Sequence, residues 1–408
     1  MKKTLGRNKI HVCIVTHVRI GETTGGIETI APAYYRWLKK EKHSATMVHR
    51  TLSGSKTYED NKAHNKDGEH SEEKKVTSVR VPHLFYIIYN MYTTLNMIIR
   101  VTRINSKEKI YAIHAEGTPF PALTAIIASR IIGAKSIIKL HGWYPDFMRV
   151  ELQDTRLEGV YTAIDVILGK IVAKNCDIMI AECENYAKVI SDKLPIEKER
   201  IEVLPECVDE RFGEIKKEKE KSEIIKISYI GRIVAIKNLR LLIYGFNEAS
   251  KINANIKLDI IGDGKEREKL EKETNRISKN KRISFLGSKR NIIKNLQETD
   301  IFVLPSISEG TPVSLLEAMY SGKAIIASKI PPIEEILTNN QDSILVDPND
   351  INEMKEAILK LANDEEMRRR IGESASKRAQ QFSYNEIFRK LISITTEKAH
   401  YSALPKKM

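Results

Sequence analysis

The stretch Asp300-Ile-Phe-Val-Leu-Pro-Ser-Ile-Ser-Glu-Gly-Thr-Pro-Val-Ser-Leu-Leu-Glu-Ala-Met-Tyr-Ser-Gly322 predicts both a fold and a binding site. It opens with a short, apolar, β-forming run that is typical of a buried strand in a parallel sheet. Thr311 before Pro312 favours a helix start, because a hydroxyl can cap free amides and proline suits the first helical position. Ser321 and Gly322 indicate where that helix ends. The segment is therefore expected to form a strand, a loop and a helix.

Two glutamates of this segment are placed to bind a ligand, Glu309 in the loop and Glu317 on the second helical turn. Ligands of open α/β sheets bind beyond the carboxyl ends of strands, where a helix start offers amides to phosphate. We therefore expect Gly310, Thr311 and Pro312 to line a ligand site. A carboxylate accepts two hydrogen bonds from vicinal hydroxyls, so one glutamate for each ring of a sugar nucleotide is the simplest interpretation. The alternative is two solvated glutamates, which the apolar neighbours of Glu317 disfavour.

Two cations follow a second predicted strand, the run 224–230. Gly231 and Arg232 come directly after it, and Lys237 precedes a helical pattern. A guanidinium and an ammonium at a strand-to-helix turn can neutralise a pyrophosphate and stabilise the charge that develops as a sugar departs. The alternative for a single basic pair is a solvated surface.

Three further strand ends carry candidate residues. Gly264 closes a Gly-Asp-Gly turn, but the dinucleotide fingerprint fails because Arg267 stands where a third glycine is required. Gly25 and Gly26 precede a helical pattern, and paired glycines let the backbone approach a phosphate or sugar. His141 ends a predicted parallel strand on the binding side. Plain turns and a structural histidine are the alternatives.

The spacing of Glu309 and Glu317, with the surrounding Pro-Ser and Glu-Ala-Met, resembles retaining glycosyltransferases of the GT-B fold, specifically glycosyltransferase family 4 and its group 1 relatives. The resemblance implies two Rossmann-like α/β domains with parallel sheets flanked by helices, and a C-terminal helix that crosses back to the first domain. We place an acceptor domain at residues 1–208, a nucleotide-sugar domain at 209–382, and the returning helix and tail at 383–408.

The resemblance also implies a reaction. A hexosyl unit would pass with retention from a nucleotide-diphosphate sugar to an acceptor glycan or lipid-linked sugar, without a metal or other cofactor. The residues that it assigns are Arg232 and Lys237 for the diphosphate, Glu317 for the ribose, Glu309 for the donor sugar, His141 and Gly26 for the opposite face, and Gly25, Gly231 and Gly264 for the lining.

Two loops depart from the family pattern. Glu206 and Cys207 replace a common Asn-Gly pair after the last strand of the first domain, on the acceptor side. Pro331 and Pro332 replace a glycine-containing turn near the donor.

Charge is concentrated at the amino end. Residues 1–150 contain 24 Lys and Arg against 12 Asp and Glu, so they carry +12 of the total +13. This favours an anionic acceptor or an anionic membrane surface such as the cytoplasmic leaflet. Nucleic acid is not expected, because aromatic-and-glycine RNA motifs and zinc-finger spacings are missing.

The run 81–99 contains no formal charge, yet its Pro, His and Asn residues make it too polar for a membrane span. Its tyrosines suit shallow contact with a membrane surface, and a partly exposed helix is the alternative. The opening residues lack a signal peptide, so we expect a cytoplasmic protein, peripheral on the membrane face if that contact forms. The four cysteines lack metal-ligand spacing, and we predict no disulfide and no zinc. The polar run 53–75 is expected to add no packed element.

Two other functions remain open at this point. A glycosidase could use Glu309 and Glu317 as its two carboxylates, although that chemistry needs no cations. A non-catalytic sugar-nucleotide-binding protein would share the site and lack turnover.

Overall fold

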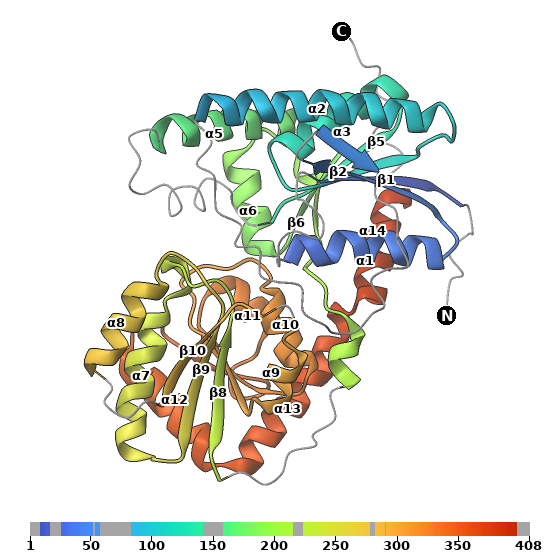
Figure 1. Ribbon diagram of the computed structural model, residues 1–408. Helices are drawn as coiled ribbons and strands as arrows, with labels where there is room; N and C mark the ends of the chain where they lie inside the picture. The colour runs from blue at the N-terminus through green and yellow to red at the C-terminus, as the bar shows by residue number, and fades with distance from the viewer. Residues whose placement is uncertain are drawn as a thin grey trace, which may run out of the picture.

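The computed structural model describes residues 9–16, 26–51, 54–57, 83–141, 158–214, 223–277, 282–289 and 291–397. Within these residues the chain forms two α/β domains, which lie one above the other in Figure 1. Each domain is a sheet covered by helices, so the expected fold class is confirmed. The first sheet ends at residue 203 and the second begins at residue 225, so the expected boundary falls between them.

The first domain has a seven-stranded sheet in the order β3-β2-β1-β4-β5-β6-β7, parallel except at the β3 edge. Its strands are β1 His11–Thr16, β2 Ser44–Thr51, β3 Gly54–Thr57, β4 Ala112–Glu116, β5 Lys135–Lys139, β6 Ile178–Ala181 and β7 Ile201–Val203. Its helices are α1 Gly26–Lys40, α2 His83–Asn105, α3 Phe120–Ile132, α5 Glu158–Asn175 and α6 Glu184–Lys193, followed by the 3-10 turn η2 Lys198–Arg200. The 3-10 turn η3 Glu210–Glu214 comes after the first domain, and its Phe212 packs into the core of the second.

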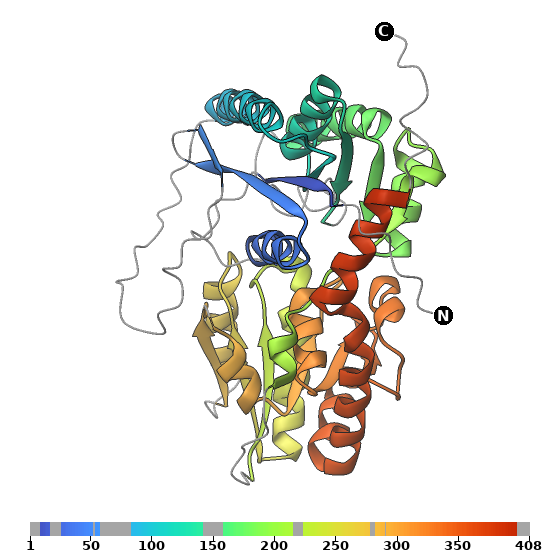
Figure 2. The same cartoon turned by 90° about the vertical axis from the view of Figure 1, so that its right-hand side faces the viewer.

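Strand β1 shows why both faces of this sheet are covered. Cys13 and Val15 face a core that α2, α3 and α5 close, whereas Val12 and Ile14 face a core that α1 closes. Figures 1 and 2 show these two helical layers on opposite sides of the sheet. A strand buried on both faces reads as a continuous apolar run, which is the pattern that predicted parallel strands.

Strand β3 corrects one expectation. Residues 54–57 belong to the polar run that was expected to add no packed element, yet they pair antiparallel with β2. Backbone groups make this pairing, so a short edge strand needs no apolar side chains. The rest of the run lies outside the described residues.

The second domain has a six-stranded parallel sheet in the order β10-β9-β8-β11-β12-β13. Its strands are β8 Ile225–Ile230, β9 Ile256–Ile261, β10 Ile283–Gly287, β11 Ile301–Leu304, β12 Ala324–Ser328 and β13 Ile344–Val346. Its helices are α7 Leu239–Ile252, α8 Arg267–Ile277, α9 Ile293–Glu298, α10 Val313–Tyr320, α11 Pro331–Ile336, α12 Ile351–Asn363 and α13 Glu365–Ala379, with the 3-10 turns η4 Ala235–Lys237 and η5 Gln380–Phe382.

The last helix, α14 (Tyr384–Glu397), returns to the first domain as expected. Its Phe388 packs against Tyr34 and Trp37 of α1, with ring centroids 4.9 and 5.8 Å apart. Farther along, Lys135 of β5 donates to the Thr395 carbonyl at 2.8 Å. Figure 2 shows this helix running upward from the second domain along the side of the first. The second half of the chain therefore completes the core of the first.

Replacing Phe388 with Ala should lower the free energy of unfolding by about 3–5 kcal/mol, because the ring is buried between two aromatic residues and its loss leaves a cavity. Chemical denaturation monitored by tryptophan fluorescence measures this loss. The neighbouring Arg389→Ala is the control, since that side chain is exposed and should change stability by less than about 0.5 kcal/mol. Equal effects of the two substitutions would show that α14 does not contribute to the first core.

Candidate active site

Residues that follow strands of both sheets meet between the two domains. Glu116 ends β4, His141 lies two residues after β5, and Glu182 follows β6. Thr311 comes from the loop after β11 in the second domain, and its backbone N–H donates to Glu182 Oε2 at 2.9 Å. The carboxyl ends of the two sheets therefore face each other, which is the edge where ligands bind in open parallel sheets.

The loop after β11, residues 305–312, is called the donor loop below. Its Glu309 is almost fully buried, and Oε1 accepts from Lys237 Nζ and from Ser306 Oγ, each at 2.6 Å. Lys237 ends the 3-10 turn after β8. The structure thus brings together a cation and a carboxylate that lie 72 residues apart in sequence.

Arg232 comes two residues after β8 and is exposed. Its carbonyl accepts from the Tyr229 hydroxyl at 2.7 Å. Burial raises the pKa of Tyr229, the charge of Glu309 raises it further, and the charge of Arg232 lowers it. The charges of Glu309 and Arg232 thus act on one phenol near the end of β8.

The glycines after β8 and β9 allow close backbone packing. A side chain at Gly264 would lie 2.2 Å from the Ile233 carbonyl oxygen, and one at Gly231 would lie 2.7 Å from the Tyr229 hydroxyl. Their proposed contact with substrate remains a prediction, because this packing already requires glycine. Gly25 lies outside the described residues, and Gly26 is the first residue of α1.

Helix α10 starts one residue later than the Thr-Pro pair suggested. Pro312 is its N-cap and has extended backbone angles, and no side chain caps the helix. The Thr311 hydroxyl instead donates to the Glu182 carbonyl of the other domain at 2.9 Å. The expected stop is correct, since Gly322 adopts a positive φ of 66°.

Glu317 lies on α10 and is half-buried. The residue whose charge shifts its pKa is acidic, Asp209. Burial first, and then the negative charge of Asp209, raise its pKa to about 8. A carboxyl group that holds its proton near neutral pH can both donate to and accept from a pair of vicinal hydroxyls. The expected role of Glu317 toward a sugar ring remains a prediction.

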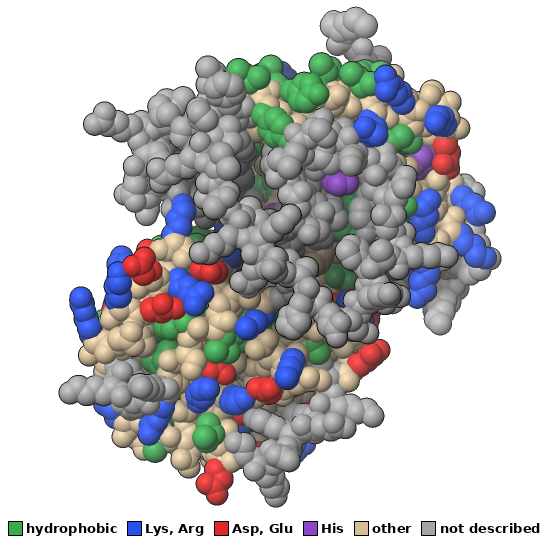
Figure 3. All heavy atoms as spheres, viewed as in Figure 1, with side chains coloured by type: hydrophobic (Ala, Val, Ile, Leu, Met, Phe, Trp, Pro, Cys, Tyr) green, Lys and Arg blue, Asp and Glu red, His purple; other side chains and the backbone are tan. Residues whose placement is uncertain are grey.

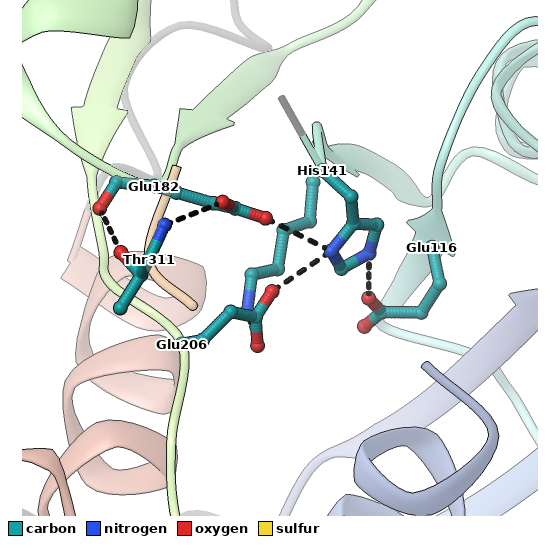
Figure 4. Close-up of polar contacts among 6 residues, drawn as sticks. Glu116, His141, Glu182, Glu206 and Thr311 are labelled. Carbon is teal, nitrogen blue, oxygen red and sulfur yellow. Dashed lines mark hydrogen bonds and ion pairs between the residues drawn. The ribbon is translucent and has the colours of Figure 1, made fainter. Parts of the chain in front are cut away.

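His141 is surrounded by glutamates that sequence reasoning missed or left without a role. Its Nε2 lies 3.0 Å from Glu116 Oε2, and its Nδ1 lies 2.8 Å from Glu206 Oε1 and 3.2 Å from Glu182 Oε1 (Figure 4). Lys139 Nζ lies 2.9 Å from the second oxygen of Glu206. These five residues are called the histidine cluster below. Only the unusual Glu206 at a family Asn position signalled them in the sequence.

The charges of the histidine cluster determine its protonation. Burial would lower the pKa of His141, but the charge of Glu206, followed by the hydrogen bonds that the three glutamates accept from the ring, holds it well above its usual value. Burial would raise the pKa of Glu206, but Lys139 and then His141 hold it well below the usual range. Burial and the charge of Glu206 raise the pKa of Glu182. The imidazole is therefore a cation held by carboxylates.

His141, Glu182 and Glu206 also place ligand-type atoms within 4.8 Å of one another, which would admit a metal ion. The Lys139 ammonium lies 2.9 Å from one oxygen of Glu206 and already pairs with it. Metal independence of this group remains a prediction.

The sequence matches two family models that divide the chain between them. Residues 24–212 match Glycosyltransferase Family 4, and residues 210–378 match Glycosyl transferases group 1. The two matches meet in the connection between the two sheets.

Three curated proteins illustrate the similarity. A UDP-Gal:alpha-D-GlcNAc-diphosphoundecaprenol alpha-1,3-galactosyltransferase from Escherichia coli is 25% identical, over 89% of this chain and 90% of its own. An N,N'-diacetylbacillosaminyl-diphospho-undecaprenol alpha-1,3-N-acetylgalactosaminyltransferase from Campylobacter jejuni is 35% identical, over 28% of this chain and 30% of its own. An uncharacterised glycosyltransferase from Methanocaldococcus jannaschii is 27% identical over 42% of this chain, which spans 44% of that protein's length.

Solved structures share the fold at low sequence identity. A sucrose-phosphate synthase from Thermosynechococcus elongatus superposes with a TM-score of 0.74 at 15% identity, covering 95% of this chain and 99% of its own. A glycosyltransferase from Rickettsia africae superposes with a TM-score of 0.69 at 18% identity, covering 96% and 98%.

Replacing Glu317 with Gln should change how stability depends on pH. The folded protein holds this proton up to about pH 8, whereas an unfolded glutamate loses it near 4.5. This carboxyl therefore favours the folded state at low pH, and its contribution declines as pH rises from 4.5 to about 8. The Gln variant should gain melting temperature relative to the parent between pH 5 and pH 9. Exposed Glu356→Gln is the control, and a matching profile for both variants would contradict the assignment.

Proposed function

The chain belongs to the glycosyltransferases that join a family 4 domain to a group 1 domain, and we propose that it transfers a hexosyl unit with retention from a nucleotide-diphosphate sugar to a lipid-linked acceptor. The observation that carries this proposal is the buried Lys237–Glu309 pair at the carboxyl edge of the second sheet, which lies across the domain interface from the histidine cluster. A diphosphate needs the cation, and a sugar hydroxyl suits the carboxylate.

The residues divide the work between binding and departure. Arg232 and Lys237 neutralise the diphosphate and stabilise its charge as the sugar leaves. Glu309 orients the sugar, and Glu317 forms hydrogen bonds with the ribose hydroxyls. Gly310 lets the donor approach the loop. A donor phosphate oxygen takes the proton of the acceptor hydroxyl, on the face from which the diphosphate departs. The closed domains exclude water, which would otherwise hydrolyse the donor.

The surroundings of the two carboxylates favour transfer over hydrolysis. A glycosidase holds an acid and a base or nucleophile about 5–10 Å apart across one bond. Here Glu309 is already paired with Lys237 and Ser306, while the group that acts most on Glu317 after burial is Asp209. Different partners for the two glutamates suit two rings of one donor better than one scissile bond.

Glu309→Ala should reduce transfer at least about 100-fold and leave nucleoside diphosphate affinity within about twofold, because the carboxylate contacts the sugar and not the nucleotide. Arg232→Ala should instead weaken nucleoside diphosphate binding about 10–100-fold through loss of a charge-assisted contact. Calorimetry and a radiolabelled transfer assay separate the two effects.

A thermal-shift screen with uridine, guanosine and adenosine diphosphate sugars selects the donor for these assays. If the Glu309→Ala variant transferred sugar at the parental rate, the role assigned to Glu309 would be wrong. If the parent bound a sugar nucleotide but transferred sugar to no acceptor, a non-catalytic sugar-nucleotide-binding protein would be favoured instead.

The acceptor side of the first domain carries an apolar surface that suits a lipid-linked substrate. Among the described residues, nine of the fourteen exposed large apolar side chains lie on α2, α3 and α5, which form one layer (Figure 1). Figure 3 shows apolar side chains along the upper edge of this domain, with basic side chains beside them. The nine are Ile88, Met91, Tyr92, Leu95 and Ile99 of α2, Ile127 and Ile131 of α3, and Ile167 and Ile171 of α5.

An anionic bilayer surface is the partner that fits this apolar surface. Helices α2 and α3 contain no acidic residue, and Arg103, Lys170 and Lys174 are exposed on α2 and α5. The residues on α2 recur every three or four positions, so they share one side of the helix. No described helix is long and apolar enough to span a bilayer. We propose that these apolar and basic side chains hold the protein at the cytoplasmic membrane surface, where a lipid-linked acceptor would lie.

Combining Met91→Glu with Leu95→Glu should abolish flotation with anionic phosphatidylglycerol vesicles, because two charges enter the centre of the apolar surface. The variant should keep the parental melting temperature and donor affinity. Ile252→Glu on the second domain is the matched control, since Ile252 is equally exposed outside this surface. Unchanged flotation of the double variant would remove the membrane from the proposal.

A further inference from the structure

Two contacts of the same kind join the domains beside the histidine cluster. Glu182 of the first domain accepts from the Thr311 amide of the second at 2.9 Å. In the opposite direction, Glu335 of α11 accepts from the amides of Glu184 and Asn185, at the start of α6, at 2.8 and 2.9 Å. Each contact links a carboxylate of one domain to backbone amides of the other. Both therefore exist only while the domains are together.

Glu182 has a second partner that distinguishes it from Glu335. One of its carboxylate oxygens accepts from the Thr311 amide, while the other lies 3.2 Å from Nδ1 of His141 (Figure 4). Its backbone carbonyl accepts from the Thr311 hydroxyl as well. A single buried residue thus spans the distance between the histidine and the donor loop.

The donor loop is shaped around this carboxylate. A side chain at Gly310 would lie 1.9 Å from Oε2 of Glu182 and 3.1 Å from the Tyr186 ring. Glycine at this position therefore leaves room for Glu182 to reach the next amide. The fit is specific to the loop that also carries Glu309.

The other two glutamates hold the histidine from the first domain alone. Glu116 binds Nε2 and Glu206 binds Nδ1, so both ring nitrogens have partners without Glu182. Holding the ring is therefore not what a third carboxylate adds. What Glu182 adds is a connection to the second domain.

We propose that Glu182 is a positioning residue that couples His141 to closure of the donor loop. The inference rests on the glycosyl transfer proposed above. With the domains together, its carboxylate faces both the imidazolium and the Thr311 amide. When they separate, the amide withdraws and the carboxylate can turn to solvent, which leaves His141 with two glutamates. The histidine cluster is then complete only around a closed donor loop, so its third carboxylate joins His141 when the donor is enclosed.

The charges around His141 give the sign of this coupling. Burial lowers the pKa of His141, but the surrounding carboxylates raise it by more than burial lowers it. Removing one carboxylate charge should therefore lower it, and more so in the closed form, where Glu182 lies nearest. The titratable groups that face the pair are Glu116 of β4, Lys139 of β5, Glu206 after β7, and Tyr186 of α6 beside Glu182.

Glu182→Gln and Glu335→Gln are compared to separate coupling from simple closure. Both variants should raise the donor KM several-fold, because each weakens a contact between the domains. Only Glu182→Gln should reduce kcat at least about tenfold and shift its pH profile toward lower pH. The pKa of the His141 ring, followed by NMR, should fall only in Glu182→Gln. The ring signal is assigned by its loss in His141→Asn. The fall should be larger with a nucleoside diphosphate bound.

A second pair of variants tests the contact from the other domain. Gly310→Ala places a methyl group against Glu182 and should reproduce the shifted titration without removing any charge. In a protein that already carries Glu182→Ala, Gly310→Ala should shift the nucleotide-bound titration of His141 by less than about a third of the shift that it causes alone. The added methyl group then no longer meets the Glu182 carboxylate.

The NMR arms need no turnover, so they remain informative if the chain transfers no sugar. Identical titrations in Glu182→Gln, Glu335→Gln and the parent would reduce Glu182 to a closure contact. A shift of equal size with and without nucleotide would show a local effect with no link to the donor loop. Full additivity of Gly310→Ala and Glu182→Ala would likewise overturn the proposal.

Discussion

The balance of buried charge around His141 is the constraint on which the acceptor half of the site depends. Glu116, Glu182 and Glu206 are all removed from water, and an unpaired carboxylate in that environment is strongly unfavourable. Among the described residues, the cations within contact distance are Lys139 and the protonated imidazole, both from β5 or the residues just after it. The three glutamates come from the ends of three different strands. Their shared need for these cations therefore fixes four strand ends relative to one another.

The same two domains are joined in two places with different properties. On one side the chain crosses between them through Val208, which pairs with Ser383, and α14 packs permanently into the core of the first domain. On the other side polar contacts join the domains: the carboxylates of Glu182 and Glu335 accept from backbone amides, and the Thr311 hydroxyl donates to the Glu182 carbonyl. Apolar burial is lost as a unit, whereas a few hydrogen bonds exchange readily with water. The first join therefore acts as a hinge, and the second can open and close with the donor.

The sequence predicted the parts of this structure that are encoded locally. Apolar runs followed by glycine predicted the strands that precede Gly231 and Gly264, and the segment from Asp300 to Gly322 has the expected strand, loop and helix. The histidine cluster could not be predicted in this way, because Glu116 and Glu182 each follow a separate strand and read as ordinary charged loop residues. Only the order β4-β5-β6-β7 brings their side chains together. The same reason explains β3, whose pairing depends on backbone groups rather than composition.

The geometry of His141 also limits what this residue can do in the reaction. Both ring nitrogens donate to carboxylates, at 2.8 and 3.0 Å, and the ring carries its positive charge at neutral pH. An imidazolium in that state has no lone pair with which to take a proton from an acceptor hydroxyl. It can still offer positive charge to a departing diphosphate across the domain interface. Under the proposed function, the acceptor proton goes instead to an oxygen of the leaving phosphate. A histidine held by glutamates is compatible with that proton transfer within the donor, because the ring is not needed as a base.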